Sequence, residues 1–198
     1  MLLCHKYPFS IVIGVYNRLI LTPKARRHDS QMKYELEELV ATYGEKLLRY
    51  ATSILYNHQD AEDVVQDVFI SAYQNKATFD GSNLSAWLYK ITYNKSINKL
   101  KRRKFLFFAD VPENTVINSE QTGLSGETLH ALSLLKPEDR ALLYGRVMEG
   151  YSYEELSQQM DISPAVLRKR YERAKKKLAD HLSVDCPDFN YEVKGAKI

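Results

Sequence analysis

Two helix-start signals lie close together in residues 152–181, and they limit what this segment can become. Ser152 and Glu155 form a Ser-x-x-Glu pattern, in which each side chain satisfies a backbone N–H at the start of a helix. Ser163 is a second favourable cap, and Pro164 suits a first helical position, where a missing N–H costs nothing. Only a short helix and a tight turn fit between them. The segment therefore predicts a helix–turn–helix, whose second helix enters the DNA major groove.

The second of these helices is strongly basic on one face. Leu167, Tyr171, Ala174 and Leu178 form its apolar stripe, and seven basic residues but one acid lie between Arg168 and Lys177. Arginine can pair with guanine in a bidentate manner, and lysine can neutralise phosphate. A solvated helical hairpin with a basic surface is the alternative. The candidate DNA-contacting residues are Ser163, Ala165, Arg168, Lys169, Glu172, Arg173 and Lys176.

Helical periodicity also governs the preceding chain. Apolar residues recur at three- and four-residue steps from Lys33 to about Asn57, and again over 64–73 and 84–104. Shorter helical patterns follow near Gly126 and from Pro137, the latter expected to end at Gly150. No strand alternation of any length occurs after residue 32, so an all-α fold is expected.

The helical patterns fall into two groups, which predicts two small domains. Residues 109–124 have no helical period and are rich in Asn, Ser, Thr, Pro and Gly, as a flexible linker is. The expected division is a domain at 32–108, this linker, a helix–turn–helix domain at 125–182 and a tail at 183–198.

The first 31 residues differ from the rest. Their apolar runs are broken by Asn17 and Arg18 and are followed by no small-x-small cleavage site, which argues against a signal peptide. The preferred interpretation is an extension outside the fold, with Met32 as an alternative start. A short additional strand or hairpin is the competing one.

Residues 84–104 combine positive charge with aromatic side chains. No Asp or Glu occurs between Gly81 and Ala109. Bases of single-stranded DNA stack on aromatic rings while phosphates meet cations, so the tract is a candidate single-strand binding surface. For Trp87 alone a core position is the favoured interpretation, and a solvated row of lysines is the alternative for the tract as a whole. The candidate contacts are Trp87, Tyr93, Asn94, Lys95, Asn98, Lys101 and Arg102.

An acidic stripe lies on the expected helix before this tract. Asp60, Asp63 and Asp67 share one face, and Asp60 is placed to cap the helix start. Acid–base catalysis, metal binding, docking of a basic partner and a solvated face are all compatible with paired carboxylates. Catalysis is the weakest of these, because no convergent His, Cys or Gly-rich loop accompanies the carboxylates.

Composition excludes several classes of protein. Five histidines are scattered, and two cysteines lie near opposite ends, so neither a zinc site nor a disulfide framework is indicated. No apolar run is long enough to span a membrane. A cytoplasmic protein without a cofactor is expected, and its net charge of +3 hints only weakly at nucleic acid.

Three segments, in this order, resemble the extracytoplasmic-function (ECF) group of the sigma-70 family. Residues 60–73 (DAEDVVQDVFISAY) resemble its polymerase-binding helix, 79–104 its segment that melts and reads the −10 element, and 135–178 its −35-reading domain. The resemblance implies a non-catalytic factor with core RNA polymerase and promoter DNA as partners. Members are often held inactive by an anti-sigma protein.

The resemblance also implies roles for single residues. Asp63, Gln66 and Asp67 match positions that grip the polymerase, which favours the docking interpretation of the acidic stripe. Asn94 matches a pocket residue for a flipped −10 base, with Lys95 and Asn98 beside it; Arg168, Lys169 and Arg173 match −35 readers. At 163–167 the chain has Ser-Pro-Ala-Val-Leu, where the usual pattern is Ser-x-Gly-Thr-Val.

Two other kinds of protein remain as alternatives. A helix–turn–helix repressor would explain residues 125–182 but leaves the basic–aromatic tract and the acidic stripe without a role, and it should bind duplex DNA alone. A helical adaptor that does not bind DNA should show weak, salt-insensitive DNA binding.

Overall fold

The computed structural model describes residues 29–75, 79, 81, 83–106 and 126–185. These residues form helices and turns only, with no strand among them, which confirms the all-α prediction. The chain divides into two compact units, residues 1–112 and 113–198. The tail expected at 183–198 begins later than predicted, because residues 183–185 are still helical. Residues 186–198, most of the N-terminal extension and the whole linker at 109–124 lie outside the described residues.

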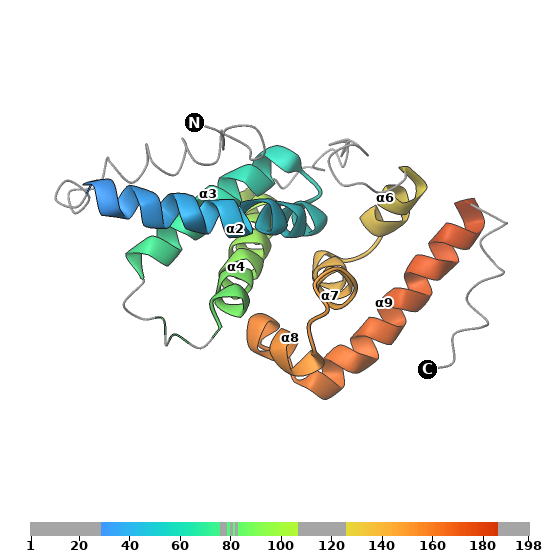
Figure 1. Ribbon diagram of the computed structural model, residues 1–198. Helices are drawn as coiled ribbons and strands as arrows, with labels where there is room; N and C mark the ends of the chain where they lie inside the picture. The colour runs from blue at the N-terminus through green and yellow to red at the C-terminus, as the bar shows by residue number, and fades with distance from the viewer. Residues whose placement is uncertain (1–28, 76–78, 80, 82, 107–125, 186–198) are drawn as a thin grey trace. The chain divides into compact units, whose positions relative to one another are not determined.

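Unit 1 is a three-helix packing of α2 (Asp29–Leu55), α3 (His58–Gln74) and α4 (Leu84–Leu106), each of which contacts the other two (Figure 1). Its core contains Tyr50 from α2 and Tyr89 from α4, whose ring centres lie 5.0 Å apart. α2 begins at Asp29, earlier than the expected Lys33, so three residues assigned to the N-terminal extension are helical. The remaining core side chains include Leu47, Ile54, Val65, Val68, Phe69 and Leu88.

The starts of α3 and α4 are both fixed by asparagine side chains. Asn57 Oδ1 accepts from the backbone N–H of Asp60 at 2.9 Å, and Asn83 Oδ1 accepts from that of Ala86 at 3.0 Å. Asparagine is among the best residues for this position, because its short side chain reaches the unpaired N–H groups of the first turn. The prediction that Asp60 caps α3 is therefore wrong, and its carboxylate is available for other contacts.

Unit 2 contains α6 (Gly126–Ser133), α7 (Pro137–Val147), α8 (Tyr153–Met160) and α9 (Pro164–Asp185). The long α9 contacts each of the other three helices, as Figure 1 shows. Arg140 of α7 donates to the Leu135 carbonyl at 2.7 Å, which pairs a backbone acceptor just after α6. An apolar cluster joins α9 to the preceding helices; it comprises Leu135, Leu143 and Ala174, with Leu132, Tyr171 and Leu178 packed against them.

The helix–turn–helix forms as the caps predict. Ser152 Oγ accepts from the Glu155 N–H at 3.1 Å, and a Glu155 oxygen accepts from the Ser152 N–H at 2.8 Å, so the capping box is complete. The turn into α9 passes through Asp161, whose φ of 54° lies in the left-handed region. α7 ends at Val147, before the expected Gly150, whose φ of 70° turns the chain toward α8.

Among the described residues, no helix is both long enough and apolar enough to cross a membrane.

Removing the cap at Ser152 should destabilise unit 2 alone. Ser152→Ala leaves the Glu155 N–H without its acceptor, and we expect a loss of about 1 kcal/mol in the free energy of unfolding. Urea denaturation followed by circular dichroism measures it. Trp87, the only tryptophan, lies in unit 1, so its fluorescence transition should not move. Ser157→Ala, within the same helix, is the matched control and should cost nothing. Equal losses in the two variants would contradict the capping argument.

Candidate nucleic-acid interface

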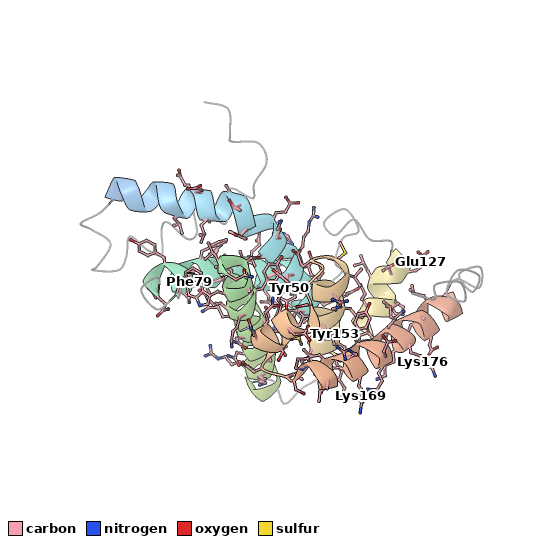
Figure 2. The ribbon with its side chains drawn as sticks, turned by 60° about the horizontal axis from the view of Figure 1, so that its bottom comes forward. Tyr50, Phe79, Glu127, Tyr153, Lys169 and Lys176 are labelled. Atoms are coloured by element: carbon pink, nitrogen blue, oxygen red, sulfur yellow. The ribbon has the colours of Figure 1, made fainter. Side chains whose placement is uncertain are left out.

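The basic face of α9 is exposed. Leu167 is fully buried, whereas the side chains of the predicted DNA face, including Lys169 and Lys176, point to solvent. Figure 2 shows these two lysines projecting from the same side of the helix. The structure thus brings the predicted contacts of the recognition helix onto one accessible surface; its exposed members are Ser163, Ala165, Arg168, Lys169, Glu172, Arg173 and Lys176.

Arg170 does not belong to this surface, although it lies in the same basic run. Its side chain pairs with Asp139 of α7 through Nε and lies 3.6 Å from a Glu138 oxygen. Asp139 is buried, so the arginine compensates a carboxylate that water reaches poorly. Arg170 therefore holds α9 against α7, and counting charges along the chain overstates the basic DNA face.

Arg168 is held by an aromatic ring at the start of α8. Its guanidinium carbon lies 5.1 Å from the centre of the Tyr153 ring, and that of Arg146 lies 4.6 Å from the same ring. Both distances fall in the range of cation–π attraction. Arg146 also donates to the Tyr151 carbonyl. The sequence prediction missed Arg146, because its position on α7 gives no sign that it meets the helix–turn–helix.

The polar contacts predicted on α4 lie mostly on its exposed side. Asn94, Asn98, Lys101 and Arg102 are exposed, and Lys95 is half-buried. Asn94, Asn98 and Lys101 follow one another at four- and three-residue steps, so they lie on one helical face. This face combines amide groups, which can pair with base edges, and cations, which can meet phosphates.

The two predicted aromatic contacts on α4 are less accessible. Tyr93 is only 7% exposed, so a base can stack on its ring only if the core around it opens. Trp87 is half-buried and stacks on Phe79, with ring centres 5.1 Å apart and planes 30° apart. The stacked pair lines a groove of about 500 Å³, together with residues of α2 and α3 such as Leu39 and Tyr73. Trp87 is thus accessible along one side of a largely apolar groove.

The acidic stripe of α3 lies against the basic tract of α4. Lys99 Nζ is 3.0 Å from an Asp60 oxygen and 3.1 Å from an Asp63 oxygen, and Arg103 is 2.7 Å from the other Asp60 oxygen. We call Asp60, Asp63, Lys99 and Arg103 the α3–α4 quartet. Residues 81–109 contain no acid, so only the packing of two helices could reveal that two of their cations are neutralised.

The predicted polymerase-contacting residues differ in accessibility. The Asp63 side chain is 52% exposed, whereas Gln66 and Asp67 are half-buried. The Asp60 side chain is 15% exposed. No cluster of three potential metal ligands occurs within the described part of the chain. Asp63 is therefore the member of the stripe most open to a partner.

Comparison with known proteins explains this combination of surfaces. Residues 39–105 match Sigma-70 region 2, and residues 125–178 match Sigma-70 region 4. The ECF RNA polymerase sigma-E factor of Haemophilus influenzae is 30% identical, over 73% of this chain and 85% of that protein. The chain belongs to the ECF group of the sigma-70 family. The two matched regions fall on the two units: region 2 covers α2 from residue 39 onward, α3 and nearly all of α4, and region 4 covers the helix–turn–helix as far as residue 178 of α9.

Two further sigma factors are also similar to this chain, and the matches cover different shares of their own lengths. SigE of Mycolicibacterium smegmatis is 29% identical, and the match covers 74% of this chain but only 61% of that protein. The solved structure of the sigma factor RpoE from Bartonella quintana, in complex with the anti-sigma factor NepR, superposes with a TM-score of 0.61 at 25% identity. That superposition covers 76% of this chain and 98% of RpoE.

Substitution by methionine should destabilise unit 2 at Arg170 but not at its neighbour Lys169. Arg170→Met leaves buried Asp139 without its partner, and we expect a loss of about 2 kcal/mol in the free energy of unfolding of unit 2. Lys169→Met removes an exposed charge and should change stability by less than about 0.5 kcal/mol. Urea denaturation followed by circular dichroism distinguishes them. Equal stabilities for the two variants would remove the structural role assigned to Arg170.

Proposed function

We propose that this protein binds core RNA polymerase and directs it to promoters, with unit 1 acting at the −10 element and unit 2 at the −35 element. The observation that carries the proposal is that both matched sigma regions present exposed polar and basic faces on the helices α4 and α9. The functional boundaries proposed are 32–108 for the first region, 109–124 for the linker and 125–182 for the second.

The acidic stripe is the proposed polymerase-binding surface. Asp63 is exposed, and Gln66 and Asp67 lie one turn away on the same helix, so the three can meet a basic partner together. A carboxylate paired with a cation across an interface gives orientation and speed of association more than affinity. The role of these residues is therefore to fix where the polymerase sits.

The exposed face of α4 is the proposed contact with the melted −10 strand. Asn94 and Asn98 supply amide donors and acceptors for unpaired base edges, and Lys101 and Arg102 supply cations for phosphates. Lys95 lies beside them. Trp87, which lines the groove with Phe79, is the ring proposed to meet a base, whereas Tyr93 is proposed to act only after local opening.

The exposed face of α9 is the proposed reader of the −35 element. Arg168 and Arg173, which are exposed, are proposed to contact base edges, and Lys169 and Lys176 to contact phosphates. Ser163, Ala165 and Glu172 complete the proposed face. The Tyr153 ring stabilises one position of the Arg168 guanidinium before DNA arrives.

Regulation by an anti-sigma protein, a cytoplasmic location and the absence of catalytic activity are also proposed. Support for regulation comes from the RpoE structure, which was solved with its anti-sigma factor NepR. Support for a non-catalytic role comes from membership of the sigma-70 family of transcription initiation factors.

Run-off transcription tests the proposal directly. Purified protein added to sigma-free bacterial core polymerase should initiate at a discrete set of sites on genomic promoter fragments. Asp63→Arg/Asp67→Arg should reduce the transcripts at least about tenfold, because two cations then stand in place of the carboxylates and repel a basic partner. Glu45→Arg/Glu127→Arg changes the net charge equally at exposed positions outside the stripe and should retain activity.

A different outcome would replace the proposal. Silent core polymerase, combined with tight binding of duplex DNA by the protein alone, would indicate a helix–turn–helix repressor. Unchanged Trp87 fluorescence in the charge-reversed variants controls for misfolding of unit 1.

The salt dependence of promoter binding should separate the two kinds of contact on α9. Lys176→Ala should reduce the slope of log K against log salt by about one, equally for promoter and scrambled −35 DNA. Arg168→Ala should weaken binding by about 1–3 kcal/mol on the preferred −35 sequence only. Filter binding of the polymerase holoenzyme measures both. Lys46→Ala, an exposed lysine of α2, should change neither quantity.

A further inference from the structure

We infer that Val166 is a further specificity-determining residue of α9, and that it recognises the C5-methyl group of one thymine in the −35 element. The inference rests on the proposed function for what α9 binds. It assigns a role to a side chain that belongs to none of the contacts proposed above, and it names the chemical group that this side chain recognises.

Val166 is the third residue of α9 and lies at the edge of its exposed face. The next residue, Leu167, is fully buried, whereas Val166 is 50% exposed. One turn further on lies Lys169, which projects to solvent in Figure 2. On the inner side of Val166, Arg170 pairs with Asp139 of α7. The N-terminal residues of a recognition helix are those that contact base edges, so Val166 lies where bases are read.

The exposure of Val166 distinguishes it from the other large apolar side chains of α9. Of those that are exposed in the described residues, Val166 alone lies on this helix; the others are Leu134, Val147 and Met148. A single exposed apolar residue is ordinary on a protein surface, so its exposure alone assigns no role. The role follows from its position among charged and polar side chains that are proposed to contact DNA.

The chemistry of valine restricts what it can recognise on DNA. Its side chain has no hydrogen-bond donor or acceptor, so it pairs neither with polar base edges nor with phosphates. The apolar group that bases present in the major groove is the C5-methyl group of thymine. The usual family pattern has threonine at this position, and Val166 carries a methyl group in place of the threonine hydroxyl. The departure from the pattern thus exchanges a polar contact for an apolar one.

The stiffness of the valine side chain favours this contact. In a helix, valine adopts one χ1 rotamer about 90% of the time, so its two methyl groups are oriented before DNA arrives. Removing one thymine methyl group from water against them should strengthen binding about fourfold. Cytosine has no methyl group at C5, so the contact discriminates against it by the same factor.

Deoxyuridine tests the contact, because it lacks only the C5-methyl group of thymidine and keeps the same base pairing. Holoenzyme formed from the full chain and core polymerase is bound to duplex promoter fragments with the −35 sequence preferred in run-off transcription. Each −35 thymidine of either strand is replaced in turn, and filter binding measures the dissociation constant. One replacement should weaken binding by the wild type about fourfold. The same replacement should change binding by Val166→Ala less than about 1.5-fold, since the partner of the methyl group is gone.

Val147→Ala is the matched control, because it shortens an exposed valine of unit 2 that lies outside the proposed DNA face. It should keep the wild-type response to deoxyuridine. Each protein is compared with itself on the two DNAs, so differences in assembly with the polymerase cancel. The response of the wild type requires no substitution in the protein, so it tests the contact even if Val166→Ala folds poorly.

Three results would overturn the inference: no thymidine whose replacement weakens binding, a response that persists in Val166→Ala, or a preferred −35 sequence without an A·T pair. A persistent response would assign the methyl group to another side chain, such as Ala165. In all three cases binding still depends on the −35 sequence, so the proposed function stands. Wild-type holoenzyme without any −35 sequence preference would instead overturn the proposed function of α9.

Discussion

Each unit depends on an ion pair between a nearly buried carboxylate and a basic residue of the helix that is proposed to contact DNA. In unit 1 Asp60 binds Lys99 and Arg103 of α4, and in unit 2 Asp139 binds Arg170 of α9. Such pairs contribute little net stability when formed, but removing one partner leaves an uncompensated charge in a poorly hydrated place. They therefore orient the functional helix, because only one rotation of α4 or α9 satisfies them.

This arrangement separates the cations of one helix into two groups. Some face inward and fix the helix, and the others face solvent and are available to nucleic acid. On α9 the adjacent residues Lys169 and Arg170 belong to different groups, since successive residues on a helix point about 100° apart. The exposed positive surface is thus smaller than the basic runs imply.

Aromatic rings play a second, local role beside these ion pairs. Tyr153 lies under the guanidinium groups of Arg146 and Arg168, and its ring also meets that of Tyr171 edge-on, with centres 6.1 Å apart. The recognition helix is therefore linked to α7 and α8 at the end where base contacts are expected. In unit 1 the stacked Phe79 and Trp87 define one wall of the apolar groove.

Local chemistry determined much of this protein from the sequence alone. The capping box at Ser152, the helical periods and the order of the motifs predicted the all-α fold and the helix–turn–helix, because caps and periodicity act between residues close in the chain. Sequence could not assign the α3 cap to Asn57 over Asp60, since both are good capping residues near the same turn. Only the tertiary structure decided which cations are free, whether Tyr93 is accessible and that Arg146 meets Tyr153. Those outcomes depend on contacts between helices, which position along the chain does not encode.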